Sequence, residues 1–199
     1  VRMAGILQAA GVPFAVEEEK LGSFEDVQTI IFTAAFLHDI GMGVGREGHE
    51  QSAVLLAQPI LDRLLAELYP GNRDKQVMAR CMIMEGIIGH MATRRVHTPE
   101  AGVILIADGC DMEQGRARIP MRIQAGPKIG DIHQFSASAI RTVEIGPGRE
   151  RPLRIAVSMG ESVGFFQVEE VLYPKIEMSP VKQHLELVAS VKGGEERRY

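Results

Sequence analysis

His38 and Asp39 stand side by side at the end of an apolar segment. Apolar residues recur before them at helical spacing, so that His38 continues a stripe expected to be buried. An imidazole and a carboxylate at such a place need partners, because an unpaired buried charge is costly. Both are ordinary ligands of zinc, iron and manganese, and a divalent cation would serve both. Taken alone, the pair favours a plainer interpretation, in which His38 is a core histidine satisfied by hydrogen bonds beside a helix-terminal aspartate.

Three more side chains of the ligand type continue helical stripes further along the chain. His49 begins one expected helix, and His90 ends the next. Asp108 stands in a third helix, started by the capping signal Thr98-Pro99-Glu100, at a position where the periodicity requires an apolar residue. Helices that pack their apolar faces together bring such groups to a common interior. A buried cluster of histidine and aspartate is what one or two metal ions require, and it explains these residues better than separate core roles do.

The composition disfavours several classes of protein. With 199 residues, 45% of them hydrophobic and 24% charged, the chain corresponds to one globular domain, or to one domain with an appendage. A net charge of −4 gives no sign of a broad basic surface, and an aromatic content of 5% offers few platforms for stacked bases. The composition therefore does not indicate a nucleic-acid partner, although it does not rule one out.

Two further observations concern the compartment. Cys81 and Cys110 are the two cysteines of the sequence, so we expect no disulfide framework and a reducing environment. No run of apolar residues approaches the length of about 18 that marks a membrane-spanning helix. We therefore expect a cytoplasmic protein with no membrane partner. A homodimer stays open.

Residues 1–132 are expected to form an all-helical domain, and the fold class is expected to be mainly α. Apolar periodicity and capping signals place helices at about 1–10, 23–39, 49–68 and 74–89, and a further one from Thr98. The first turn of the second of these, Ser23-Phe24-Glu25-Asp26, resembles a capping box. Four glycines lie between the second and third helices: Gly41, Gly43, Gly45 and Gly48. They follow a helix rather than a strand, so we expect them to let the backbone crowd a site rather than to form a dinucleotide turn.

Residues 133–199 are expected to form a small α/β appendage. Residues 140–145 and 153–158 alternate and are rich in β-branched side chains around a Gly-Pro turn, which predicts a β-hairpin. A short helix is expected from about Ser162 to Tyr173. The segment 181–191 is predicted to be another strand, with a helix left as the alternative.

With these residues in view, the sequence resembles the HD-domain superfamily of metal-dependent phosphohydrolases over Phe32 to about Ile119. The branch it resembles most contains the catalytic domain of ribonuclease Y and small archaeal and bacterial relatives. The motifs that carry the resemblance are His38-Asp39-Ile40-Gly41, Glu47-Gly48-His49-Glu50-Gln51-Ser52-Ala53, Ile87-Ile88-Gly89-His90, Thr98-Pro99-Glu100-Ala101, Ile106-Ala107-Asp108 and Gly115-Arg116-Ala117-Arg118. This combination of motifs is specific for the superfamily, but it does not indicate which substrate the protein acts on.

The resemblance implies one or two divalent metal ions (iron, manganese, zinc, nickel or magnesium) in an HD-type helical bundle. A first ion would fall to His38, Asp39 and Asp108, and a second to His49 and His90, with Asp39 as the bridge. Asp39 and His90 are also the candidates for handling protons during catalysis. Arginines suit the binding of phosphate oxygens, although each taken singly is more often a solvated surface charge. The arginines concerned are Arg46, Arg116 and Arg118.

The expected function is therefore the metal-dependent hydrolysis of a phosphomonoester or phosphodiester of a nucleotide or a related molecule. The alternative is a non-catalytic sensor that binds metal or nucleotide on the same fold. Two departures from the family pattern favour this alternative. Met42 follows His-Asp-x-Gly where family members often have lysine, and no histidine precedes His38. We expect the missing histidine in a segment upstream of Val1.

Overall fold

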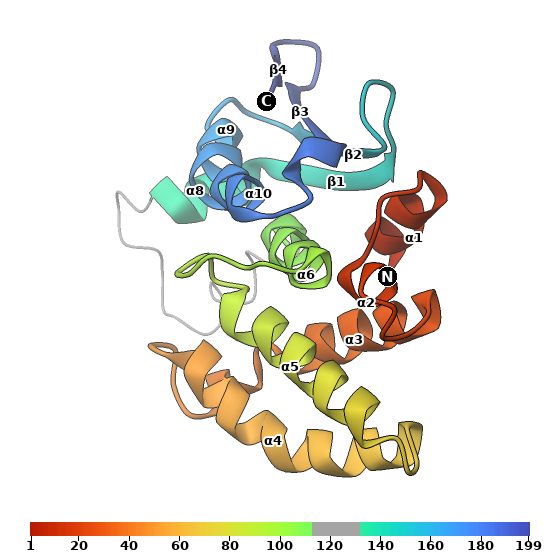
Figure 1. Cartoon of the computed structure of the whole chain (residues 1–199). Helices are drawn as coiled ribbons and strands as arrows, with labels where there is room; N and C mark the ends of the chain where they lie inside the picture. Colours follow the sequence, from red (N-terminus) through yellow and green to blue (C-terminus); the bar gives the residue numbers. More distant parts are fainter. Residues whose placement is uncertain (113–131) are drawn as a thin grey trace.

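The computed structural model describes residues 1–112 and 132–199, and its helices and strands fall into two groups along the chain (Figure 1). The first group is α1 (Arg2–Ala9), α2 (Ala15–Glu18), α3 (Phe24–Leu37), the 3₁₀ turn η1 (Ile40–Gly43), α4 (His49–Leu68), α5 (Arg73–Gly89) and α6 (Pro99–Cys110). The second group is α8 (Ile132–Ala139), β1 (Ile140–Pro147), β2 (Leu153–Met159), α9 (Gly164–Gln167), the π-helical turn η2 (Val168–Leu172), α10 (Tyr173–Met178), the 3₁₀ turn η3 (Lys182–His184), β3 (Leu185–Val191) and β4 (Glu196–Arg198).

The helix starts predicted from capping signals are confirmed. The side chain of Asp26 accepts a hydrogen bond from the Ser23 amide, which completes a capping box at the start of α3. Thr98 caps α6 by accepting from the amide of Ala101, and a proline stands in the first turn. These caps satisfy amides that have no partner inside the helix. They fix where α3 and α6 begin, and each of these helices carries a cluster residue at or near its far end.

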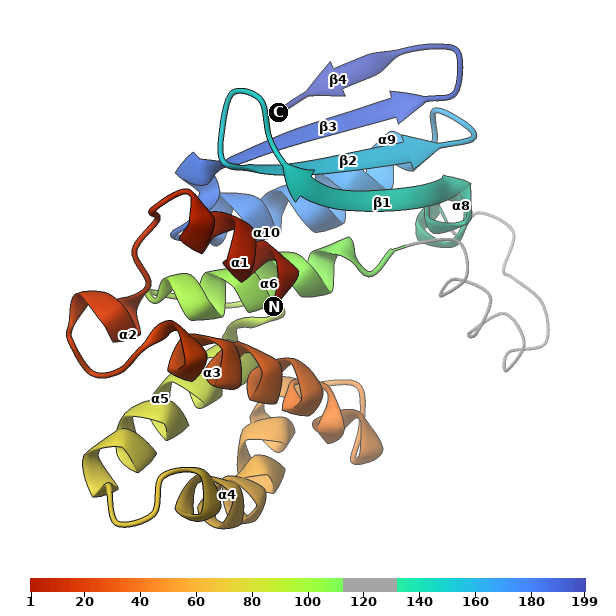
Figure 2. The same ribbon diagram turned by 90° about the vertical axis from the view of Figure 1, so that its right-hand side faces the viewer.

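Helix α6 is the centre of the molecule. It packs against α3 and α5 on one side and against η2 and α10 on the other. Both views show α6 between α3 and α10 (Figure 1, Figure 2). Glycines permit the close approach: a Cβ at Gly86 of α5 would overlap Ile104, and one at Gly102 would lie 2.5 Å from Oγ of Ser179. One cluster of buried apolar residues runs through both groups of elements, from Met3 to Ala189.

The second group contains a four-stranded sheet in the order β1-β2-β3-β4. Strands β1 and β2 form the predicted antiparallel hairpin, and β4 pairs antiparallel with β3. Strand β3 runs parallel to β2, with α9, η2 and α10 as the crossover between them. These helices lie between the sheet and α6 (Figure 2). The predicted strand within 181–191 is confirmed as β3, and the helical alternative for that segment is wrong.

The predicted mainly α class is wrong. The chain combines a helical core with a four-stranded mixed sheet, which makes it a mixed α/β protein. The physical reason is the parallel pairing of β2 with β3, which joins a hairpin and a later strand into one sheet and buries strand residues such as Ile155 and Leu187. Among the described helices, none is both long and apolar enough to cross a membrane.

Candidate metal centre

The structure brings the five predicted ligands together at the ends of four helices. His38 caps the C-terminus of α3, and Asp39 immediately precedes η1. His49 is the first residue of α4, and His90 caps the C-terminus of α5. Asp108 lies in the last turn of α6. Each side chain is thus fixed by a helix terminus or a turn.

The donor atoms form two groups that share Asp39. In the first group, Nε2 of His49 lies 3.1 Å from Nε2 of His90, and both lie close to Oδ1 of Asp39, at 3.3 and 3.4 Å. In the second group, Nε2 of His38 lies 3.6 Å from Oδ2 of Asp39 and 3.6 Å from Oδ1 of Asp108. One carboxylate oxygen of Asp39 faces each group. One donor atom each of His38, Asp39 and His90 also lies within 4.8 Å of the others.

All three imidazoles are held in the same way. The Nδ1 atom of each lies within hydrogen-bond distance of the backbone carbonyl three residues earlier, at 2.8 Å for His38, 2.8 Å for His49 and 2.6 Å for His90. A carbonyl only accepts, so Nδ1 carries the hydrogen in each ring. The lone pair of a neutral ring then sits on Nε2, which faces the cluster. This is the tautomer in which histidine binds a metal through Nε2.

The contact between His49 and His90 tests whether these residues fit a metal. Both Nε2 atoms present lone pairs at 3.1 Å, so a direct hydrogen bond requires an extra proton on one ring. Burial, the largest influence on His90, lowers its pKa and disfavours that proton. A divalent cation between the rings relieves the conflict. Donors about 2.1 Å from one ion in tetrahedral directions lie about 3.4 Å apart, close to the spacings of the first group. The residues therefore fit a metal ion.

In the second group, the surroundings favour the charged forms of both His38 and Asp108. Burial alone would lower the pKa of His38, but the nearby Asp108 carboxylate, the hydrogen bond to the Ala35 carbonyl and the charge of Asp39 favour the protonated ring, outweigh burial and raise this pKa. Burial alone would raise the pKa of Asp108, but the adjacent His38 imidazole and the charge and hydrogen bond of Lys175 hold this pKa well below its usual range. Asp108 is therefore a carboxylate with one oxygen directed at His38.

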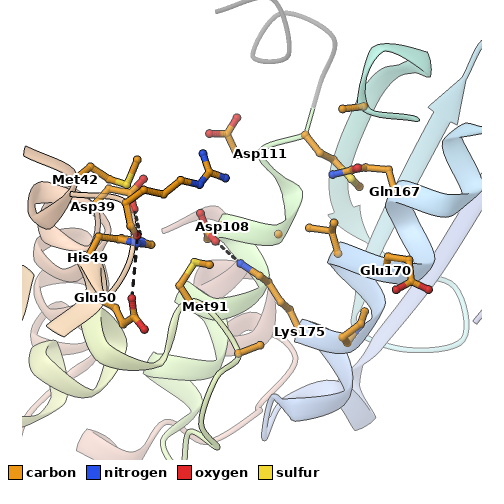
Figure 3. Close-up of a pocket in the computed structure, with 18 residues that line it drawn as sticks. Asp39, Met42, His49, Glu50, Met91, Asp108, Asp111, Gln167, Glu170 and Lys175 are labelled. Atoms are coloured by element: carbon orange, nitrogen blue, oxygen red, sulfur yellow. Dashed lines mark hydrogen bonds and ion pairs between the residues drawn. The ribbon is translucent and has the colours of Figure 1, made fainter. Parts of the chain in front are cut away.

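The cluster lies at the edge of a cavity of about 1000 Å³ between the two groups of elements. Figure 3 shows Asp39 and His49 on one wall, Gln167 and Lys175 on the facing wall, and Asp108 between them. Arg46 lines this cavity. Arg116 and Arg118 lie outside the described residues. Met42, which stands where members of the HD-domain superfamily often have a lysine, lines the cavity as well.

Comparison with known proteins finds a relative in an archaeon. The chain is 36% identical over 192 residues to the uncharacterized protein MJ1020 of Methanocaldococcus jannaschii, an alignment that covers 96% of this chain and 72% of the archaeal protein. The chain belongs to the MJ1020 family. No family model matches it, and no solved structure does. The name of the relative states no activity, so the function of this MJ1020-family chain has to be argued from its site.

Sequence reasoning missed one residue of this MJ1020-family site. Lys175 of α10 contacts Asp108 and lines the cavity, although it is 134 positions beyond the HD motif's glycine in no recognisable motif of its own. A signal was present: Lys175 follows the buried Val168 and Leu172 at helical spacing, so a charge stands on an apolar stripe. The expected helix ended at Tyr173, which left Lys175 outside it.

The expectation that a glycine lets the backbone crowd the site is confirmed at Gly41. A Cβ there would overlap the carbonyl oxygen of His49 and lie 2.6 Å from the amide nitrogen of Ala53. Glycine thus lets the turn after Asp39 touch the backbone of α4 at its first residues. At Gly43 and Gly45 a Cβ would meet no atom within 4 Å, so they show no such need.

Proposed function

We propose that this protein is a metal-dependent phosphohydrolase of the HD type that cleaves a phosphomonoester or phosphodiester of a nucleotide or a related molecule. The observation that carries the proposal is the pair of donor groups that share Asp39, one oxygen to each. A carboxylate between two sets of donors suits two neighbouring cations, an arrangement common in phosphate-ester hydrolysis. The resemblance of the HD and later motifs supports the same reaction.

The five candidate ligands divide into two sets, one for each metal ion. His49, His90 and Asp39 would hold one ion, and His38, Asp108 and Asp39 the other. A bound divalent ion supplies a water of lowered pKa and polarises a phosphoryl oxygen. Three protein donors to an ion leave room for such a water or for substrate, as in catalytic rather than structural sites.

The exposure of the side chains separates their roles. The side chain of Asp39 is 40% exposed, whereas that of His90 is 1% exposed. Asp39 therefore borders the cavity and is the better placed of the two to take a proton from an attacking water and pass it to solvent. His90 holds its tautomer through the Ile87 carbonyl and serves as a fixed donor.

The cavity suits a phosphorylated small molecule. Its volume of about 1000 Å³ matches the upper range of ligand sites. Arg46 supplies a guanidinium fork on its wall, which is suited to phosphate oxygens. The substrate would enter between the helical core and the sheet-bearing part, both of which line the cavity.

A second candidate is a metal- or nucleotide-binding sensor without turnover. The lining of the cavity favours it: carboxylates outnumber the arginine and lysine side chains among the described residues. The carboxylates are Asp39, Glu50, Asp108, Asp111 and Glu170, and the two cations are Arg46 and Lys175. Met42 adds no charge where the resemblance expects a lysine. Such a surface binds cations more readily than it binds a free phosphate ester.

One experiment separates these candidates. The protein is purified without chelator, its metal content is measured by elemental analysis, and hydrolysis is assayed on a panel of phosphomonoesters and phosphodiesters with and without added Mn²⁺. The proposal requires bound or recruited metal, turnover that a chelator abolishes, and loss of turnover in His38→Ala with an unchanged circular dichroism spectrum. His97→Ala, which removes an exposed histidine outside the cluster, is the matched control and retains activity. Bound metal with no turnover on any ester identifies the metal-binding sensor, and a protein that takes up no metal refutes both the hydrolase and the metal-binding sensor.

A further inference from the structure

Lys175 reaches the candidate metal centre from the sheet-bearing part of the chain. Its residue is 8% exposed, and its ammonium donates to a carboxylate oxygen of Asp108, 67 positions earlier in the sequence. The same ammonium donates to the backbone carbonyl of His90 at 2.9 Å. Figure 3 shows the Lys175 side chain crossing from α10 to Asp108 at the side of the cavity.

The two oxygens of Asp108 have different partners. Oδ2 accepts from Lys175, and Oδ1 faces Nε2 of His38 at 3.6 Å. The ion pair therefore fixes the rotation of the carboxylate and leaves Oδ1 for the second donor group. Carboxylates that bind metals are usually oriented by such an outer hydrogen bond, and losing the outer partner typically weakens metal binding about 10–100-fold.

The contact with His90 acts on the first donor group. His90 ends α5, where the last carbonyls have no partner within the helix. The Lys175 ammonium satisfies the His90 carbonyl and ties the end of α5 to α10. One side chain thus restrains a residue of each donor group.

The burial of Lys175 distinguishes its ion pair from an ordinary ion pair at the protein surface. A buried ammonium is costly unless it is paired and hydrogen-bonded, and Lys175 has both kinds of partner. Its stem also packs closely, because a Cβ at Gly109 would lie 3.1 Å from its Cδ. By contrast, Lys182 of the same part pairs with Glu177 at the surface, with side chains 48% and 47% exposed.

We propose that Lys175 is a positioning residue of the metal centre: it holds Asp108 and the turn of His90 so that their donor atoms face His38 and Asp39. This inference rests on the proposed metal centre. It assigns the sheet-bearing part a role in the site beyond lining the cavity, because α10 carries the group that orients a ligand 67 positions away.

The test is a calorimetric titration with Mn²⁺ alone. It uses the full chain, as metal-free wild type and as metal-free variants. Lys175→Met is expected to weaken Mn²⁺ binding about 10–100-fold. Lys175→Arg, which keeps a cationic donor, is expected to recover part of that loss. Lys182→Met, which removes an exposed lysine of the same part, is the control and binds Mn²⁺ as wild type does. If Lys175→Met does not fold, Lys175→Gln replaces it, with about a 10-fold loss expected because the charge is gone while a donor remains.

The outcomes are distinguishable from failure of the metal centre itself. A wild type that binds no Mn²⁺ overturns the proposed function, and this inference with it. A wild type that binds Mn²⁺ while folded Lys175→Met or Lys175→Gln binds it within twofold of wild type overturns this inference alone. A purely structural role predicts that second result, together with a lowered melting temperature. A loss of affinity that Lys175→Arg partly restores supports the positioning role.

Discussion

His49 and His90 direct their Nε2 atoms at each other across 3.1 Å, although each ring already uses the hydrogen on Nδ1 for a backbone carbonyl. Neutral rings held in this way have two lone pairs in contact, which is unfavourable. The helix ends that hold the rings leave them little freedom to turn away. The folded protein without metal therefore carries a local conflict that a cation removes.

The first prediction follows from this pair. Metal-free protein, prepared with chelator, is expected to melt at a higher temperature when Mn²⁺ or Zn²⁺ is added. A ligand at 100 times its dissociation constant stabilises by about 2.7 kcal/mol, which for a chain of this size is a rise of about 5–10 °C. Asp39→Asn, which removes the charge shared by both donor groups, is expected to abolish the rise. A wild-type melting curve that does not respond to any divalent metal would contradict the assignment of these residues as ligands.

The second prediction concerns Gly41. In Gly41→Ala the new methyl group overlaps the carbonyl oxygen of His49, so α4 must move away from the turn after Asp39. Overpacking of this kind costs about 1–3 kcal/mol, and here it also separates His49 from Asp39. We expect lower stability in urea and weaker Mn²⁺ binding. Gly43→Ala lies two residues away where a Cβ meets nothing within 4 Å, and its effect is expected to stay within about 0.5 kcal/mol. Equal behaviour of the two variants would contradict the close approach.

The helical elements of the cluster were predictable because local signals determine them. A capping box fixes the start of α3, a threonine-proline cap fixes the start of α6, and Asp108 interrupts an otherwise apolar stripe. These features act over three to seven residues and leave a trace in the sequence. The proximity of His49 to His90, 41 positions apart, followed from the expectation that inward faces of packed helices meet.

The sheet and Lys175 were less accessible for different physical reasons. Parallel pairing of β2 with β3 is a long-range choice that strand alternation alone does not reveal. Pro174 suggests a helix end, because proline lacks an amide hydrogen and obstructs the preceding turn. The π-helical turn η2 ends just before Tyr173, where α10 begins, so Pro174 lies in the first turn of a new helix. Helical structure therefore continues to Lys175. The charged residue then stands on the buried face.

The third prediction tests the cap that starts α6. Thr98 accepts a hydrogen bond from the amide of Ala101 at 3.2 Å and donates to Glu85 of α5 at 2.6 Å. Thr98→Ala is expected to lower the free energy of unfolding by about 1–2 kcal/mol in urea denaturation. Thr93→Ala removes an exposed hydroxyl in the segment before α6 and is expected to change it by less than about 0.5 kcal/mol. A neutral Thr98→Ala would mean that packing alone places α6.

The last prediction is a pH dependence that originates at Asp26. Its Oδ2 accepts from the Ser23 amide at 2.8 Å and from the Lys75 ammonium at 2.9 Å, joining the start of α3 to α5. Burial alone would raise the pKa of Asp26, but the hydrogen bonds from Lys75 and Ser23 outweigh burial and lower this pKa. A carboxyl whose pKa is lower in the folded state stabilises that state fully above its unfolded pKa of about 3.9. This stabilisation is lost as the pH falls through the lower pKa of the folded state.

Asp26→Asn is therefore expected to reduce the free energy of unfolding by about 2 kcal/mol at pH 7, because a charged acceptor of two hydrogen bonds is replaced by a neutral group. The difference from wild type should stay constant between pH 7 and about pH 5 and shrink below about pH 4, where Asp26 becomes protonated in unfolded wild type before it does in the folded protein. Urea denaturation of both proteins from pH 7 to pH 3 measures it. Asp62→Asn, which changes a side chain that is 68% exposed, is the control and is expected to differ from wild type by less than about 0.5 kcal/mol throughout. A difference for Asp26→Asn that grows as the pH falls would have the wrong sign and would rule out the ion pair as its source.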